Sequence, residues 1–430
     1  MPRRTDCRDD GDVTAREKTS VGPKGWSPTP ATAAGGPIKR LAASVFLGYL
    51  GFGATLQLLP AWIAQRLHGG PLVVGLAVGI AFGAAAICRP LAGRAGDTGH
   101  ARGVVVTAGV LITVGALGQW LAPTLGVVLA ARLIMGAGEA ALFNGALPWV
   151  LAGIPAEQRG RVAGWFGLSM WAGLALGPLA TVAATHVAGL SGAWMAIAAL
   201  GVFSALIAST TRRQRINQTT PVSPTSSWRQ VLPRGAGLPG LIFGAAAYGY
   251  GTISALLVLF LDHSMGAGSS IGLTVFAAAF LFARVAGSSV ADRLRRKTLT
   301  ILNLCVEAGG LTVVATAHTL AAAMIGTAIT GAGVGLMFPA IVALTLNRVG
   351  GERAGAAVGA ASSLWDIGIM IAGPLGGALV HLGYPAAFVA AAFIVCAAAV
   401  VVAVLSETPR PRASPAVTSS HPPHQGARHE

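Results

Sequence analysis

Charged side chains are scarce in this sequence. Only 10% of its 430 residues are Asp, Glu, Lys or Arg and 53% are hydrophobic, whereas about 25% of residues are charged in a typical soluble domain. The four cysteines fall in the N-terminal tail or in apolar segments, which gives no sign of a disulfide framework. The first 40 residues contain no apolar run, so we expect no cleavable signal peptide. This composition predicts an integral membrane protein.

The motifs of several enzyme classes are also missing. We find no His-Glu-x-x-His zinc motif, no Gly-x-Ser-x-Gly nucleophile elbow and no phosphate-binding loop. The last absence also argues against an ATP-driven pump. We therefore expect neither an enzyme nor such a pump, and we expect no cofactor and no metal. A non-transporting membrane receptor or scaffold remains an alternative from a different class.

Long apolar segments follow one another along the chain. Each is long enough to cross a bilayer, which takes about 20 residues of helix. The sequence thus predicts an all-α integral membrane protein with about twelve transmembrane helices, six in each half. We place the spans at 41–65, 71–92, 103–122, 124–151, 161–185, 188–211, 238–262, 268–291, 299–318, 321–346, 355–380 and 385–406. The 59 glycines fit helices that pack closely in lipid.

The second half of the chain repeats the first at an offset of 195 residues. Arg89 recurs as Arg284, and the Gly-Ala-Gly tripeptide at 136–138 recurs at 331–333. A period this long is too large for a solenoid unit, so it indicates two copies of a whole helix bundle. Two parallel bundles related by an axis along the membrane normal are the architecture of one large class of transporters. The duplication therefore predicts function as well as fold.

The net charge of +15 is concentrated on one side of the predicted membrane. If the first span runs outward, 26 of the 30 Lys and Arg residues fall in the tails and cytoplasmic loops. Only Arg66 lies outside, and three arginines (Arg89, Arg132 and Arg284) lie within spans. This positive-inside asymmetry predicts a multi-pass protein of the plasma membrane with both termini in the cytoplasm. Lipid head groups account for the basic loops, so we expect no nucleic-acid partner.

The apolar segments divide the chain into five parts. Residues 1–40 and 407–430 are predicted to be disordered cytoplasmic tails because they are polar and rich in proline and charge. Residues 41–211 and 237–406 are each predicted to form a six-helix bundle. Residues 212–236 combine arginines with a Ser/Thr/Pro stretch and are predicted to form a cytoplasmic linker between the bundles.

A charged loop follows the second span. Its ten residues include Gly93, Asp97 and Arg102, and a second copy at matched positions keeps Asp292 and Arg293. Both copies resemble the loop of the major facilitator superfamily, in which Gly, three residues and Asp precede basic residues, although the first copy departs at three positions and the second lacks the first Gly. The resemblance covers most of the chain. It implies two six-helix bundles, latched together on the cytoplasmic side by these five residues.

The span 124–151 carries side chains that are costly to place in lipid. Arg132, Gly136 and Gly138 resemble the family's Arg-x-x-x-Gly-x-Gly motif, which is associated with proton-coupled members, and Glu139 follows directly. An ionised carboxylate at this depth would cost several kcal/mol, so we expect Glu139 to load and release a proton in the physiological range. The alternative is a structural Glu bonded to Arg132 or to the backbone, although seven residues of helix separate the two by about 10 Å.

The span 355–380 supplies a second acidic group. Asp366 lies in this span, where some efflux members that the chain resembles also carry an acidic residue. An Asp in a helix can also bond a Ser or the backbone locally, so a structural role stays open. We predict that Glu139 is the main coupling residue, with Arg132 beside it and Asp366 secondary.

Gly-Pro pairs interrupt two of the spans. Residues 173–178 resemble the Gly-x-x-x-Gly-Pro motif of the antiporter branch, and Gly-Pro recurs at 373–374. A proline removes one backbone hydrogen bond and glycines allow close crossing, so these sites are predicted to flex. The predicted hinge residues are Gly173, Gly177, Pro178, Gly373 and Pro374. The chain thereby resembles the drug or metabolite (arabinose-type) efflux permeases.

The central cavity of this family is lined mainly by the first, fourth, seventh and tenth spans. Residues on those spans that could line it are Tyr49, Phe52, Gln57, Asn144, Tyr248, Tyr250 and Phe338. Few fixed charges occur there, which favours a moderately apolar or neutral solute over a polyanion. We therefore predict a monomeric, proton-coupled exporter of a small drug-like or metabolite solute. Import by proton symport stays open, because the same carboxylates could couple in either direction.

Overall fold

The chain folds into helices, with no strand among the residues that the structure describes. The computed structural model describes residues 35–152, 154, 156–211, 235–266, 268–287, 294–349 and 354–404. From Pro37 onward these residues belong to one compact unit. A helix satisfies every backbone N–H and C=O within its own segment, which a lipid environment requires. The all-α prediction is confirmed.

The first half contains five long helices and one short turn. They are α1 (Gly35–Leu67), α2 (Pro71–Ala95), the π-helical turn η1 (Gly96–His100), α3 (Ala101–Trp120), α4 (Leu125–Leu151) and α5 (Ala156–Thr210). Helix α1 begins six residues before the predicted start of its span, because a proline is tolerated in the first turn of a helix and Ile38 already packs on the core. Helix α5 holds two of the predicted spans, which join at Gly189, where the backbone is non-helical (φ 68°, ψ −174°).

The second half repeats this arrangement. Its helices are α7 (Gly237–Phe260), η2 (Leu261–Met265), α8 (Gly272–Ala286), α10 (Arg296–Ala315), α11 (Leu320–Gly335), α12 (Met337–Val349), α13 (Ala354–Leu379), η3 (Val380–Leu382) and α14 (Tyr384–Val404). Ten helices in the described ranges are long and apolar enough to cross a membrane, with α11 and α12 forming one span and α8 falling short at 15 residues. Because α5 contains two predicted spans, the described helices account for all twelve.

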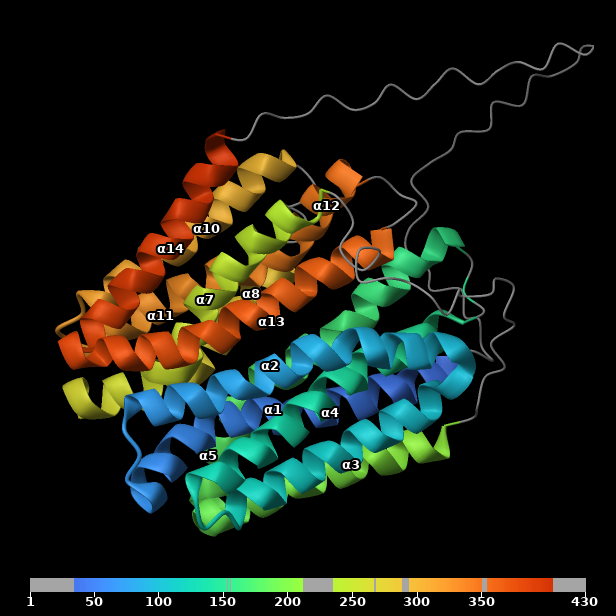
Figure 1. The fold of residues 1–430 in the computed structure, drawn as a ribbon, viewed down its shortest axis with the longest axis horizontal. Helices are drawn as coiled ribbons and strands as arrows, with labels where there is room; N and C mark the ends of the chain where they lie inside the picture. The colour runs from blue at the N-terminus through green and yellow to red at the C-terminus, as the bar shows by residue number, and fades with distance from the viewer. Residues whose placement is uncertain are drawn as a thin grey trace, which may run out of the picture. The chain divides into compact units, whose positions relative to one another are not determined.

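The two halves meet along three pairs of helices. In the first half α3 packs against α4 and α5, and in the second half α10 packs against α11 and α14. Across the halves, α2 lies along α13 (Figure 1), α5 contacts α8, and α2 also contacts α7. The first of these contacts places the functional side chains described below.

Small residues allow the closest helix contacts. A Cβ atom built on Gly136 of α4 would overlap the backbone of Ala81 in α2, so this position of the Arg-x-x-x-Gly-x-Gly motif must remain a glycine. Between the halves, the backbones of Gly75 in α2 and Gly373 in α13 touch in the same way. Glycine at such sites lets two helices approach until their backbones meet.

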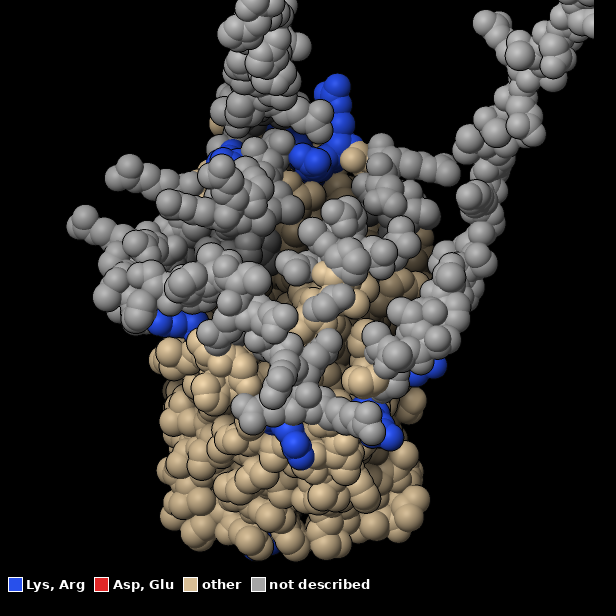
Figure 2. Space-filling model, turned by 90° about the vertical axis from the view of Figure 1, so that its right-hand side faces the viewer, with Lys and Arg blue, Asp and Glu red and all other residues tan. Residues whose placement is uncertain are grey.

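The two ends of the helices differ in charge. At one end, where α2 ends and α3 begins, the Lys and Arg residues whose side chains are described are Lys39, Arg40, Arg94, Arg102, Arg295, Arg296, Lys297 and Arg348. We call this the basic end, and the opposite end, where α1 ends, the far end. The right-hand side of Figure 1, shown in Figure 2, carries Lys and Arg and no Asp or Glu among its coloured residues. At the far end, Arg66 is the single described Lys or Arg.

Candidate functional site: a buried arginine between two carboxylates

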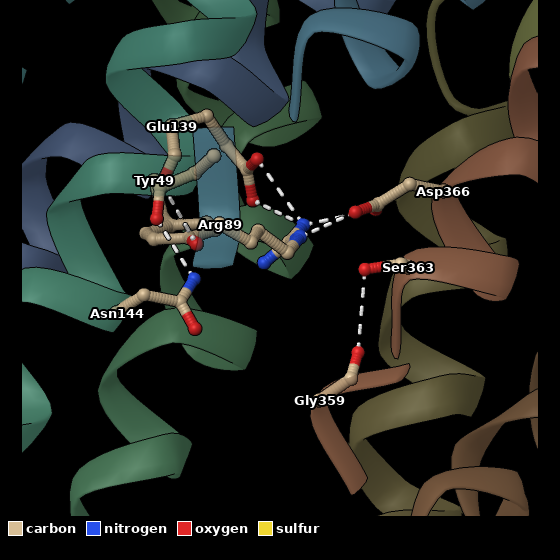
Figure 3. A network of polar contacts seen from close by, with 8 residues as sticks. Tyr49, Arg89, Glu139, Asn144, Gly359, Ser363 and Asp366 are labelled. Carbon is tan, nitrogen blue, oxygen red and sulfur yellow. Dashed lines mark hydrogen bonds and ion pairs between the residues drawn. The ribbon is translucent and has the colours of Figure 1, made fainter. Parts of the chain in front are cut away.

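Three charged side chains from three helices meet between the two halves. Arg89 of α2 lies between Glu139 of α4 and Asp366 of α13 (Figure 3). Its Nη2 donates to Oε1 and Oε2 of Glu139 at 3.1 and 3.2 Å and to Oδ1 of Asp366 at 3.0 Å. Its Nε donates to the second oxygen of Asp366. We call these three residues the triad.

The triad is almost closed to solvent. Asp366 is 0% exposed and Glu139 3% exposed, while 15% of the Arg89 side chain is accessible. One guanidinium carries a single positive charge, so it cannot balance two ionised carboxylates. A buried excess charge is costly in a low-dielectric interior. One bound proton on either carboxylate would make the triad neutral.

Glu139 does not pair with the arginine of its own helix. Arg132 instead donates from Nε to the carbonyl of Ala77 at 2.8 Å and from Nη2 to that of Val78 at 3.3 Å, both in α2. Its guanidinium carbon also lies 5.3 Å from the ring centroid of Phe52. Arg132 thereby ties α4 to α2 and leaves the Glu139 carboxylate to Arg89. The sequence argument that their spacing is too long for direct contact agrees with this arrangement.

Asp366 does not rely on a local partner either. Its carboxylate reaches Arg89 in the other half of the chain, and the neighbouring Ser363 donates to the carbonyl of Gly359 at 3.3 Å. On the other side of the triad, the hydroxyl of Tyr49 donates to the backbone carbonyl of Glu139 at 3.1 Å (Figure 3). The site is thus held from α1, α2, α4 and α13.

A group of aromatic side chains adjoins the triad. This aromatic cluster consists of Trp171, Phe243, Tyr250, Phe276, Phe280, Phe338 and Trp365, with neighbouring ring centroids 4.4 to 6.4 Å apart. Trp171 comes from α5 in the first half, and the other six come from α7, α8, α12 and α13. Because Trp365 directly precedes Asp366, the cluster and the triad are neighbours.

An apolar pocket lies between the halves beside this cluster. Its cavity volume is about 30 Å³, and it is lined by residues of α1, α5, α7 and α8, with no charged side chain among them. Trp171, Tyr250, Phe276 and Phe280 of the cluster form part of its wall. An apolar space with an ionisable group nearby is typical of small-molecule sites, although this one would have to widen to admit a drug-sized solute.

The duplicated helices, the buried charges and the pocket agree with a comparison against known protein families. The family model described as Major Facilitator Superfamily matches residues 41–273 and 240–426. The chain belongs to this superfamily. Its members are transporters of small molecules in lipid bilayers and are not enzymes. The predictions of a membrane transporter and of a protein without enzymatic activity are thus confirmed. The narrower resemblance to arabinose-type efflux permeases stays a prediction.

Individual relatives support the same assignment. The transporter is 32% identical to an uncharacterized MFS-type transporter of Salmonella typhimurium over 379 residues, covering 85% of this chain and 95% of the relative. An uncharacterized MFS-type transporter of Burkholderia mallei is 30% identical over 378 residues, covering 85% and 91%.

Solved structures confirm the fold. A bacterial homolog of the human lysosomal transporter Spinster, in an inward-facing and unoccupied conformation, superposes with a TM-score of 0.72 at 13% identity, covering 87% of this transporter and 97% of that chain. The nucleoside transporter NupG superposes with a TM-score of 0.68 at 14% identity, covering 86% and 98%.

The structure describes part of the predicted cytoplasmic latch. Arg102 donates to the backbone carbonyl of Ser209, a contact between α3 and α5 within the first half. Gly93 lies in α2, where a built Cβ would meet nothing within 4 Å. The side chain of Asp97 lies outside the described residues, as do Asp292 and Arg293. A latch between the halves therefore stays a prediction for this transporter.

The predicted hinge residues lie at close helix contacts. A Cβ built on Gly173 or Gly177 of α5 would overlap the backbone of α1, and Gly373 meets Gly75. Pro178 and Pro374 both lie inside their helices. Close packing explains the glycines, and motion at these points stays a prediction. The proposed linker at 212–236 lies outside the described residues, apart from its last two, and so do both tails beyond Gly35 and Val404.

The predicted cavity residues divide between the pocket and the helix contacts. Tyr250 lines the pocket and Phe338 belongs to the aromatic cluster. Phe52 packs edge-on against Phe82, with ring centroids 5.5 Å apart. Gln57 donates to the carbonyl of Ser269 at 2.9 Å.

Two further cavity candidates are polar groups on helix faces. Asn144 donates to the carbonyl of Ala140 one turn earlier, at 2.8 Å. Tyr248 is 4% exposed, and its hydroxyl has no hydrogen-bond partner among the described residues. Neither contributes to the pocket wall.

The sequence argument missed the central residue of the site. Arg89 was recognised as a basic residue within a span, but no role followed from that position alone. The signal was that a lone arginine in lipid requires a counter-charge. Glu139 and Asp366 were the two carboxylates within spans that were given a coupling role, so the pairing was available in principle.

Proposed function

We propose that this transporter exports a small drug-like or metabolite solute in exchange for protons, and that the triad is its coupling site. The observation that carries this proposal is that a single guanidinium binds a carboxylate from each half of the molecule. In alternating access, the two halves rock against each other around a fixed site. A titratable contact that joins them therefore changes with the transport cycle.

The charge balance of the triad favours a proton as the coupling ion. Arg89 with two ionised carboxylates has a net charge of −1, and one proton removes this excess. Protonation of Asp366 would replace a charge-assisted pair by a neutral one and leave Arg89 with Glu139. Charge-assisted hydrogen bonds are about twice as strong as neutral ones. Binding of the proton thus loosens the contact between the halves, and its release restores that contact.

The contacts between the halves indicate which side is open. At the far end, Gly75 meets Gly373, and a Cβ on Gly377 would overlap Leu72, so α2 and α13 are in close contact there. Toward the basic end, a Cβ built on Gly93 of α2 or Gly359 of α13 would meet nothing within 4 Å. Both positions are therefore open to a new side chain, unlike the close contacts at the far end.

The distribution of charge orients the transporter. The positive-inside rule places the basic end in the cytoplasm, so the contacts at the far end support an inward-facing state of a monomer in the plasma membrane. In this state a cytoplasmic solute reaches the pocket while the triad holds the halves together.

Flux measurements with matched probes test the proposal. Naphthalene-2-carboxylate, naphthalene-2-carboxamide and 2-(aminomethyl)naphthalene share one aromatic body and differ in charge. Purified transporter is placed in liposomes that contain a pH-sensitive dye, and counter-movement of protons is followed as each probe is added. We expect at least one probe to drive proton movement in the opposite direction. Glu139→Gln and Asp366→Asn should reduce it by about ten- to a hundredfold, because each removes charge-assisted hydrogen bonds of about 1.5–3 kcal/mol.

Glu307→Gln is the matched control, because Glu307 is a second fully buried carboxylate in a span but lies outside the triad. It should keep proton coupling. Proton movement in the same direction as the probe would replace export by symport. The absence of proton movement with all three probes, or a triad variant that stays fully coupled, would refute the proposal.

A further inference from the structure

Another arginine within a predicted span has no carboxylate partner among the described residues. Arg284 of α8 is half-buried at the edge of the aromatic cluster. Its guanidinium carbon lies 5.1 Å from the ring centroid of Trp171 and 5.8 Å from that of Phe338. Its Nη1 donates to the carbonyl of Gly335 at 3.3 Å. Among the described residues, no carboxylate lies within ion-pair distance of it.

The duplication makes this arrangement the counterpart of the triad. Arg284 occupies the position of Arg89 in the repeat, 195 residues later, and Asp366 falls 195 residues after Trp171. The pair Arg89–Asp366 therefore corresponds to the pair Arg284–Trp171. Both pairs join the two halves, the first between α2 and α13 and the second between α5 and α8. In the first copy the arginine binds carboxylates, and in the second it lies against aromatic rings.

Arg284 has hydrogen-bonding capacity that the described residues do not use. A guanidinium has five N–H donors in a planar fork that matches a carboxylate. Arg89 uses this fork on two carboxylates, and Arg132 directs two donors to carbonyls of α2. Arg284 has one described acceptor, while its remaining surroundings include the faces of two aromatic rings. An anion could satisfy the remaining donors and balance the charge.

We propose that Arg284 and the aromatic cluster bind the substrate, and that the substrate is an amphipathic organic monoanion with an aromatic or similarly apolar body. Its carboxylate would pair with the Arg284 guanidinium, and its apolar body would lie against the cluster and the adjoining pocket, whose wall carries no charge. This inference rests on the proposed function and narrows its substrate class. It also replaces the neutral solute expected from the sequence by a singly charged one.

The two equivalent contacts would then respond to different ligands. A proton on Asp366 weakens Arg89–Asp366, whereas an anion on Arg284 competes with the ring of Trp171 for the guanidinium. Each ligand of the exchange would act on a different contact between the halves. Export of a monoanion against one proton moves two positive charges inward per cycle, so an inside-negative membrane potential drives both movements.

Binding measurements on the purified full-length transporter test this site. Isothermal titration is carried out with naphthalene-2-carboxylate and with its neutral amide. We expect the wild type to bind the carboxylate about tenfold more tightly than the amide, a difference of about 1.4 kcal/mol. Arg284→Gln should abolish this preference by weakening carboxylate binding, and should leave amide binding unchanged. Arg284→Lys keeps the charge but loses the planar arrangement of donors, so its preference for the carboxylate should lie between those of the wild type and Arg284→Gln.

The far end of the transporter offers a matched control. Arg66 also lies over a tryptophan, with its guanidinium carbon 5.2 Å from the ring centroid of Trp62. It lies on α1, about 15 Å along the helix axis from Leu56, the residue of α1 that lines the pocket. Arg66→Gln should therefore leave the carboxylate preference intact. If Arg284→Gln does not fold, the loss seen with Arg284→Lys decides the question.

The outcomes separate this inference from the proposed function. Equal affinity of the wild type for the two probes, or a preference that persists in the Arg284 variants, would overturn the anion site. Proton-coupled flux of the amide or the ammonium probe that is unaffected by Arg284→Gln would also overturn the anion site, but it would leave the proposed proton exchange supported. Carboxylate binding that depends on Arg284, without any proton-coupled flux, would support the site and remove the proposed function.

Discussion

Replacing Asp366 by Asn isolates the contribution of the contact between the halves. The substitution keeps the shape of the side chain and removes its charge. In the structure Asp366 accepts hydrogen bonds from Nε and Nη2 of Arg89, and it is fully buried. Removing one partner of a buried ion pair costs about 3–5 kcal/mol when the other charge is left alone. Arg89 keeps two hydrogen bonds to Glu139, so we expect the lower value for charge-assisted bonds, about 1.5–3 kcal/mol.

This magnitude predicts a measurable change of state. If the contact exists in the inward-facing state and is lost in the opposite one, Asp366→Asn shifts the equilibrium away from the inward-facing state by about ten- to a hundredfold. Acidification of the wild type should shift it in the same direction, because a proton on Asp366 removes the same charge. The variant should show a weaker response to pH than the wild type.

Distances between spin labels report this equilibrium. One pair, at Leu91 of α2 and Gly359 of α13, spans the basic end, where both positions are open to a new side chain. A second pair, at Gly70 and Leu382, spans the far end. The native cysteines are replaced beforehand. In Asp366→Asn we expect the basic-end distance to shorten and the far-end distance to lengthen.

Two results would refute this reasoning. In the first, Asp366→Asn leaves both distance distributions as in the wild type while the protein remains folded. In the second, the variant responds to pH as strongly as the wild type does. Either result would mean that the triad does not control the arrangement of the halves.

Two further predictions concern packing. Gly75→Ala places a methyl group against the backbone of Gly373, so it should separate the far end and lengthen the label distance there, whereas Gly309→Ala in α10, which meets nothing within 4 Å, should not. Neither carboxylate oxygen of the buried Glu307 has a hydrogen-bond partner among the described residues, so its neutral form fits this site. Glu307→Gln should therefore leave the thermal midpoint nearly unchanged, and Glu307→Ala should lower it because a cavity costs about 2–3 kcal/mol. A large loss in the Gln variant would show that the charge matters.

The fold follows from features that the sequence displays directly. Apolar length sets the number of spans, and the 195-residue offset sets the two halves. Within α5 the predicted spans 161–185 and 188–211 meet within a few residues of the observed break at Gly189, although no polar loop separates them. Apolarity marks the residues that lie in lipid, but it does not show where one helix turns into the next.

The site was predictable to the extent that burial is costly. Glu139 and Asp366 were singled out because a carboxylate in lipid requires a functional or structural partner. Their shared partner Arg89 lies 50 residues from one and 277 from the other, so no local spacing connects them. The aromatic cluster was even less accessible, since its seven rings come from five helices and each ring alone is typical of core packing.

The contact of Gly75 with Gly373 has a consequence for how the halves can move. Where the side chains of two helices interdigitate, one helix can slide past the other only if those side chains leave one set of grooves and enter the next. At this crossing the two surfaces are bare backbone, so no rotamer has to change when α2 rolls over α13. This crossing can therefore serve as a pivot near the far end, about which the two helices rotate without side-chain rearrangement. Small rotations there become larger displacements at the basic end, about a membrane's thickness away.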